Sequence, residues 1–130
     1  MLKTIMLVED DPDIQFITRL SLETIGGYDV QVCSSGPDAV RLGPSYAPDL
    51  ILLDVMMPGM DGPATMDALR ELPQLADTPI VFFTANTHNE MRQALLLRGA
   101  LDIIIKPIEP TALVEQIGAI WHRIASGNAN

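Results

Sequence analysis

Residues 49–62 have the sequence DLILLDVMMPGMDG, in which Asp49 is followed by an unbroken apolar run at positions 50–53. A strand that is apolar at every position is typical of a sheet that is covered on both faces by helices. Asp54 follows this run directly, and Pro58 and Gly59 then predict a tight loop. The stretch therefore predicts a buried parallel strand with a carboxylate at its carboxyl end.

Outward from this strand, the chain alternates short apolar runs with longer helical patterns. The expected strands are residues 4–8, 29–33, 50–53, 80–83 and 103–105, and the expected helices are residues 12–24, 37–42, 63–72, 89–98 and 110–124. Repeated strand–helix pairs specify a doubly wound α/β fold with a parallel sheet. Ligands of such folds bind beyond the carboxyl ends of the strands, so we expect the functional residues there.

Several helix boundaries have a local cause in the sequence. Pro12 behind Asp11, and Pro37 behind Ser35, are typical of first-turn prolines that follow a polar N-cap. The glycine pair at 26–27 is expected to end the first helix. Asp11 is therefore assigned a capping role rather than a place in a binding site.

The composition limits the possible partners. The chain has 130 residues, the size of one domain, and its 8 Lys and Arg against 17 Asp and Glu give a formal charge of −9. Direct binding to nucleic acid or to an anionic membrane would need a basic patch, which this composition disfavours. The one cysteine, Cys33, excludes an internal disulfide and is expected to be buried, and no apolar run approaches the length of a membrane span. We therefore expect a soluble cytoplasmic domain over residues 1–125, followed by a short polar tail at 126–130, with no direct nucleic-acid partner and no membrane insertion.

Polar residues gather at the carboxyl ends of the expected strands. Glu9 and Asp10 follow the first strand and Asp54 follows the third, so parallel strands would bring three carboxylates to one edge of the sheet. Such a cluster needs a cation to offset its repulsion, and Mg²⁺ prefers hard oxygen ligands. Thr84 and Lys106, at the ends of the fourth and fifth strands, add a hydroxyl donor and a positive charge that suit a phosphoryl group. The set of residues predicts Mg²⁺-dependent phosphoryl chemistry.

Other candidate ligands are assigned structural roles. The methionines after Asp54 have no Cys or His beside them to complete a soft-metal site, so loop packing is expected. The two histidines are far apart in the sequence and are expected on helix surfaces. These residues are Met56, Met57, Met60, His88 and His122.

Four segments together resemble the receiver domains of two-component response regulators, and the resemblance covers nearly the whole chain. The segments are IMLVEDDPDI at 5–14, DLILLDVMMPGMDG at 49–62, PIVFFTA at 79–85 and GALDIIIKPI at 99–108. The resemblance implies a flavodoxin-like (βα)5 fold with five parallel strands in the order 2-1-3-4-5. It also implies a signalling phosphoacceptor that promotes its own phosphorylation and dephosphorylation, rather than a metabolic enzyme.

The same resemblance implies roles for the strand-end residues. Asp54 would accept a phosphoryl group from a sensor histidine kinase or a histidine phosphotransfer protein, and a downstream effector protein would recognise the resulting conformational change. Thr84 and Lys106 would contact the transferred oxygens, and Pro107 permits a cis peptide bond that would aim Lys106 at the acids. The implied Mg²⁺ ligands are Glu9, Asp10, Asp54 and the backbone carbonyl of Met56.

One position departs from the family pattern. The family often carries Tyr or Phe three residues before the lysine, where this chain has Ile103. An isoleucine cannot make the inward rotation of an aromatic ring with a polar tip. We therefore expect phosphorylation to act mainly by drawing Thr84 and residues 85–89 toward Asp54.

Two functions of other kinds remain open. The sequence DPD at residues 11–13 loosely matches the nucleophile motif of Mg²⁺-dependent phosphatases of the haloacid dehalogenase type, although the chain is short for that fold and lacks a late acidic pair. The other is a non-phosphorylated interaction module of the same fold, against which the intact Asp54, Thr84 and Lys106 argue. The Met1 start and the lack of a linker favour a stand-alone regulator over a receiver cut from a hybrid kinase or a longer regulator.

Overall fold

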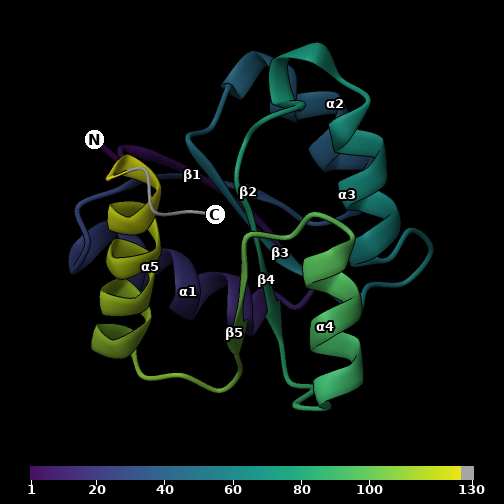
Figure 1. Cartoon of the computed structure of the whole chain (residues 1–130). Coiled ribbons are helices and arrows are strands. Elements are labelled where there is room, and N and C mark those ends of the chain that lie inside the picture. The colour runs from purple at the N-terminus through teal and green to yellow at the C-terminus, as the bar shows by residue number, and fades with distance from the viewer. Residues whose placement is uncertain (127–130) are drawn as a thin grey trace.

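Strands and helices alternate along residues 1–126, the part of the chain that the computed structural model describes (Figure 1). This alternation confirms the fold class expected from the apolar runs. The elements are β1 (Thr4–Val8), α1 (Pro12–Thr24), β2 (Asp29–Cys33), α2 (Gly36–Tyr46), β3 (Leu50–Asp54), α3 (Gly62–Arg70), the short 3₁₀ helix η1 (Pro73–Leu75), β4 (Ile80–Thr84), α4 (Asn89–Leu97), β5 (Asp102–Ile105) and α5 (Pro110–Ala125).

The strands form one parallel sheet in the order β2-β1-β3-β4-β5, as expected. Val8 pairs with Leu53, and Asp54 pairs with Phe83, so the carboxyl ends of neighbouring strands are nearly level. Strand order reverses at β1, because the chain first adds β2 on one side of it and then β3 on the other. A ligand crevice is expected at this switch point, beyond the ends of β1 and β3.

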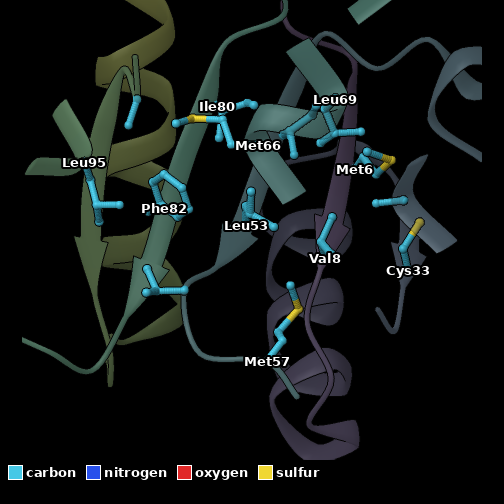
Figure 2. Packing of buried hydrophobic residues seen from close by; sticks show 14 of the residues in the cluster. Met6, Val8, Cys33, Leu53, Met57, Met66, Leu69, Ile80, Phe82 and Leu95 are labelled. Carbon is cyan, nitrogen blue, oxygen red and sulfur yellow. The ribbon is translucent and has the colours of Figure 1, made fainter. Parts of the chain in front are cut away.

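Helices cover both faces of the sheet. Helices α1 and α5 lie on one face, and α2, α3 and α4 lie on the other (Figure 1). Consecutive strand residues therefore enter different cores: Leu52 packs with α1 and α5, and Leu53 packs with α2, α3 and α4. Figure 2 shows Val8, Leu53 and Phe82, each from a different strand, together in the core between the sheet and helices α2, α3 and α4. Burial on both faces explains why β3 has no alternating polar positions.

The predicted N-caps of α1 and α2 are both formed. Asp11 Oδ1 accepts hydrogen bonds from Asp13 N–H at 2.8 Å and from Ile14 N–H at 3.3 Å. Ser35 Oγ accepts one from Asp38 N–H at 3.2 Å. These bonds satisfy first-turn donors that have no partner within the helix.

Helix α2 was expected to end at residue 42, but in the structure it continues to Tyr46. Pro44 lies inside the helix, which nevertheless runs to Tyr46, and Ala47 N–H still donates to the Gly43 carbonyl at 2.8 Å. A proline removes its own N–H donor but leaves the donors that follow it intact. The longer helix packs closely against η1, an element that the sequence pattern did not predict: a Cβ at Gly43 would lie only 2.7 Å from Leu75 Cδ1.

Strands β3 and β4 each extend one residue beyond the predicted apolar run, to Asp54 and Thr84. Their backbones continue to pair there, Asp54 with Phe83 and Thr84 with Ile105. The two polar side chains are therefore positioned by the sheet itself rather than by loops.

Helix α4 is the least buried of the α-helices, since Leu95 is its one buried side chain. Ion pairs join it to two other elements: Arg98 to Asp67 of α3 at 2.6 Å, and Arg92 to Asp102 of β5 at 3.7 Å. Exposed ion pairs contribute little to stability. Helix α4 is therefore attached to the domain mainly through buried Leu95 and partly buried Met91.

No helix within residues 1–126 is both long enough and apolar enough to cross a membrane. The predicted tail begins at Ser126, directly after α5, and residues 127–130 lie outside the described residues. The predicted domain end at residue 125 stays a prediction.

Candidate functional site

Three carboxylates converge at the carboxyl end of the sheet. Glu9 and Asp10 follow β1, and Asp54 ends β3. One carboxylate oxygen from each lies within 4.8 Å of the others. Glu9 and Asp54 are buried, with 1% and 5% of their surfaces exposed, whereas Asp10 is accessible. The strand-end argument thus predicted this cluster correctly.

Lys106, which follows β5, places its ammonium group between two of these acids. Its Nζ donates to Glu9 Oε1 at 2.7 Å and lies 3.2 Å from Asp54 Oδ1. The Lys106–Pro107 peptide bond is cis, which is the isomer that the resemblance implied. The ammonium also lies 5.0 Å from the ring centroid of Phe83, a distance at which the aromatic face attracts a cation.

Burial changes the acidity of Glu9. Its pKa rises from 4.5 to about 7, mainly because burial removes the carboxylate from water, and the charge of Asp54 raises it further. Hydrogen bonds from Lys106 and from Asp11 N–H oppose this rise only in part. Independently of this pKa, three carboxyl groups lie close together beside the one ammonium group of Lys106, so a cation would offset their mutual repulsion.

The donor set fits a hard divalent cation. All three acidic side chains offer oxygen ligands, and Asp10 is accessible to an incoming ion. Mg²⁺ binds such oxygen sets while keeping several water ligands, so it does not need a closed protein cage. The excess of negative charge would be reduced by the ion, which makes Glu9, Asp10 and Asp54 residues that could hold it.

The two oxygens of Asp54 have different surroundings. Oδ1 accepts hydrogen bonds from Lys106 Nζ at 3.2 Å and from Met56 N–H at 3.3 Å. The Met56 peptide group therefore lies against the carboxylate, and within residues 1–126 no protein donor is bonded to Oδ2. Oδ2 is the oxygen that remains available for chemistry.

Thr84 lies at the end of β4, beside the strand that carries Asp54, and is 1% exposed. Its Oγ accepts a hydrogen bond from Asn86 N–H at 3.1 Å. This bond uses an oxygen lone pair and leaves the hydroxyl proton for another acceptor. Thr84 and Lys106 are thus brought to the same edge of the sheet as the acids, as predicted.

Glycines shape the loop that follows Asp54. Gly59 has φ of 75°, a left-handed conformation that suits glycine, in agreement with the predicted tight loop. Gly62 N–H donates to the Val55 carbonyl at 2.9 Å, and a Cβ at Gly62 would collide with the carbonyl oxygen of Asp54. This close approach closes the loop against the end of β3.

Several contacts of the site were not predicted from the sequence. The pairing of Lys106 with Glu9, the placement of Lys106 over Phe83, and the hydrogen bond from Gln15 to the Glu9 carbonyl are all new. Phe83 had a signal that could have found it, since it directly precedes Thr84 in a strand that ends at the site. Gln15 belongs to no motif, and its position within α1 carries no comparable signal.

Most of the residues given structural roles occupy them. Cys33 is buried, and burial raises the pKa of its thiol to about 11. His122 is exposed on the surface of α5, as expected, whereas His88 is exposed but lies just before α4 rather than on a helix surface. Of the loop methionines, Met57 is buried, but Met56 is 74% exposed, so the expectation of loop packing is wrong for its side chain. Its position is set by the backbone contact to Asp54, which leaves the side chain pointing to solvent.

Comparison with known proteins gives one family. The family model described as the response regulator receiver domain matches residues 5–118. An uncharacterized 14.6 kDa protein in the sodA1 3′ region of Leptolyngbya boryana is 36% identical over 113 residues, which are 87% of this chain and 86% of that protein. The transcriptional regulatory protein AfsQ1 of Streptomyces coelicolor is 37% identical over 120 residues, which are 92% of this chain but only 52% of AfsQ1. The chain therefore spans about half the length of AfsQ1.

Solved structures show the same fold. The chemotaxis protein CheY4 of Vibrio cholerae superposes with a TM-score of 0.85 at 28% identity, covering 92% of this chain and 99% of that chain. The receiver domain of the sensor histidine kinase PA1611 from Pseudomonas aeruginosa, solved with a magnesium ion coordinated in its active-site cleft, gives a TM-score of 0.80 at 29% identity, covering 92% and 97%.

Proposed function

The chain belongs to the response regulator receiver domain family, and from this membership we propose that it accepts a phosphoryl group on Asp54 and signals by the conformational change that follows. The observation that supports this most directly is the place of Asp54 at the end of a central strand, buried among acids and 3.2 Å from the Lys106 ammonium. The domain acts as a signalling phosphoacceptor that promotes its own phosphorylation and dephosphorylation.

Asp54 acts as the nucleophile through Oδ2, the oxygen that Lys106 and Met56 N–H do not occupy. Oδ2 attacks the phosphorus atom of a phosphohistidine in the donor protein. The new O–P bond forms as the P–N bond breaks, and the donor imidazole keeps the electron pair of the broken bond. Asp54 must be ionised for this attack, and the nearby ammonium of Lys106 favours that form.

Charge stabilisation comes from groups at the ends of the neighbouring strands. The transferring phosphoryl group spreads its negative charge over three equatorial oxygens. Lys106 and the Thr84 hydroxyl donate to these oxygens, and no protein base is needed because the nucleophile is already a carboxylate. Bound Mg²⁺ would supply further neutralisation of the phosphoryl charge. The residues proposed to hold it are Glu9, Asp10, Asp54 and the backbone carbonyl of Met56.

Phosphorylation with a small donor tests this function. We expect incubation with Mg²⁺ and acetyl phosphate to add one acid-labile and alkali-labile phosphoryl group, which peptide mass mapping locates on Asp54. Asp54→Asn should lose the label. Asp13→Asn, which changes an exposed acid of α1, is the matched control and should keep it.

The same labelling experiment also tests the alternative of a haloacid dehalogenase-type phosphatase. Asp11 caps α1 in the structure, and its side-chain oxygen already accepts two backbone hydrogen bonds. The comparisons provide no support for a haloacid dehalogenase-type phosphatase. Labelling that survived Asp54→Asn but was lost in Asp11→Asn would overturn the proposed function and favour that alternative.

The proposed partners follow from the chemistry of the acceptor. The phosphodonor is a sensor histidine kinase or a histidine phosphotransfer protein, and a downstream effector protein binds the changed surface. The formal charge of −9 disfavours direct contact with nucleic acid. We place the domain in the cytoplasm, because its one cysteine is a buried thiol, which suits a reducing compartment.

A further inference from the structure

We infer that Gln15 is a positioning residue for the cation site, because its side-chain amide fixes the peptide group that joins Glu9 to Asp10. The inference rests on the proposed Mg²⁺-dependent function and adds a residue from α1 that makes no contact with the ion itself. Its evidence is a set of hydrogen bonds that leaves Glu9 little freedom.

The Gln15 amide joins two segments that are distant in the sequence. Its Nε2 donates to the Glu9 carbonyl oxygen at 2.5 Å and to Ser34 Oγ, in the loop between β2 and α2, at 3.0 Å. A carbonyl oxygen can only accept a hydrogen bond, so the NH₂ group of Gln15 must be the end that faces Glu9. Gln15 is half-buried, which limits competition from water for these bonds.

Glu9 is held at each of its polar groups. Its backbone N–H donates to the Cys33 carbonyl at 3.0 Å, and its own carbonyl accepts from Gln15. Its side chain accepts from Lys106 at Oε1 and from Asp11 N–H at Oε2. The Gln15 bond is the contact in this set that fixes the direction of the Glu9 carbonyl.

That direction matters because it determines where Asp10 begins. The peptide unit is planar, so fixing the Glu9 carbonyl also fixes the N–H and the Cα of Asp10. Asp10 is the accessible acid of the cluster and follows β1, where sheet pairing no longer constrains the chain. Loss of the Gln15 bond would let this peptide rotate and spread the Asp10 carboxylate over positions that do not suit the ion.

The test compares two glutamine substitutions. Gln15→Met keeps the length and neutrality of the side chain but removes its donors, and Gln116→Met makes the same change at an exposed position of α5. We expect Gln15→Met to weaken Mg²⁺ binding by calorimetry about tenfold, the lower end of the effect of changing a residue that orients a metal ligand. Gln116→Met should bind like the parent. Ser34→Ala, which removes the second acceptor but keeps the first, should have a smaller effect than Gln15→Met.

A second measurement uses the metal-free protein. The hydrogen bond from Gln15 to the Glu9 carbonyl polarises the Glu9–Asp10 peptide. Gln15→Met should therefore shift the Asp10 amide nitrogen resonance, whereas Gln116→Met should leave this resonance where it is in the parent. A purely structural role of Gln15 would lower the free energy of unfolding without changing Mg²⁺ affinity or the Asp10 resonance at native conditions. If the parent binds Mg²⁺ and Gln15→Met binds it with the same affinity, the inference about Gln15 is overturned but the proposed function is not. Absence of Mg²⁺ binding in the parent would overturn the proposed function and this inference together.

Discussion

Glu9 and Asp10 are adjacent in the chain but differ in how readily their carboxylates can bind a cation. Both oxygens of Glu9 already accept hydrogen bonds, one from Lys106 and one from Asp11 N–H. Asp10 is accessible instead. A cation that binds directly to Glu9 must compete with protein donors, whereas one that binds Asp10 replaces mainly water.

We therefore expect Asp10→Ala to weaken Mg²⁺ binding more than Glu9→Ala does, and by about tenfold or more relative to the parent. Calorimetric titration measures both affinities. Lys106→Ala is the control, because it removes a charge that faces the acids without removing an oxygen ligand, and it should retain binding. An Asp10→Ala variant that binds Mg²⁺ as tightly as the parent would contradict this assignment.

The raised pKa of Glu9 predicts how stability depends on pH in metal-free protein. A carboxyl group whose pKa rises on folding, here from 4.5 to about 7, stabilises the fold fully below pH 4.5, and this contribution is lost as the pH rises through 7. The loss amounts to roughly 3 kcal/mol, since each tenfold change in a proton affinity is worth about 1.4 kcal/mol.

Glu9→Gln should remove this dependence because the amide does not ionise. We expect the free energy of unfolding of the variant, minus that of the parent, to increase between pH 4.5 and 7.5. Urea titrations in the presence of a chelator, at several pH values, measure the difference. A constant difference over this range would show that Glu9 titrates normally.

Strand-end logic identified the principal site residues because parallel pairing alone brings them together. Glu9, Asp54 and Thr84 needed no knowledge of side-chain direction, only of which strands are neighbours. Gln15 and Phe83 act through the direction of their side chains toward Glu9 and Lys106, which depends on the packing of α1 and β4. The position of Phe83 beside Thr84 could have drawn attention to it, but the sequence pattern does not show that its ring faces Lys106 or that the Gln15 amide faces Glu9.

At the scale of elements, the segment between β4 and α4 connects the site to the most weakly attached helix. It begins at Thr84, which is held by the sheet, and ends at α4, which buries only Leu95. Residues 85 and 87–89 are exposed, so little packing opposes their movement. A gain in contact between Thr84 and a phosphoryl group can therefore move this segment at small cost.

Ile103 should take little part in that movement. It is 5% exposed and packs in the core that contains Leu95 and Phe82, and a β-branched side chain strongly restricts its own rotamers. We expect a beryllofluoride mimic of the phosphoryl group to shift the backbone resonances of residues 84–89 strongly, with little change in the Ile103 methyl resonances. The adjacent Ile104, which packs in the other core, is the internal reference.

Methyl NMR of the free and mimic-bound protein makes this comparison. A change of Ile103 rotamer on activation, with Ile104 unmoved, would mean that isoleucine replaces the aromatic switch residue of other family members.

At the scale of the whole molecule, the order of elements and the strand order both agree with what the sequence and the family resemblance predicted. The apolar runs predicted the alternation of strands and helices, because each run must be covered on both sides. The strand order was predicted by the family resemblance. The clearest error concerns α2, which was expected over residues 37–42 but continues through Pro44 to Tyr46, where Gly43 packs closely against Leu75. Propensity is a weaker force than burial in such places.

The separation of the interior by the sheet has a consequence for how substitutions can compensate for one another. Leu52 and Leu53 are neighbours in β3 and are both fully buried, but they belong to different cores. Leucine-to-alanine substitution at either position should cost about 2–5 kcal/mol and leave a void. Only a side chain that borders a void can refill it. Second-site suppressors of Leu52→Ala should therefore arise on α1, on α5 or at strand positions of the same core, and those of Leu53→Ala on α2, α3, α4 or strand positions of the other core.

A genetic selection for restored folding, such as survival of displayed variants under protease, can map both sets of suppressors. Suppressors of the two variants that fell on the same helices would contradict the separation. If the two sets of suppressors do segregate, Leu52 and Leu53 belong to different groups of co-evolving positions although they are adjacent in β3. Adjacency in the sequence is then a poor guide to which residues change together.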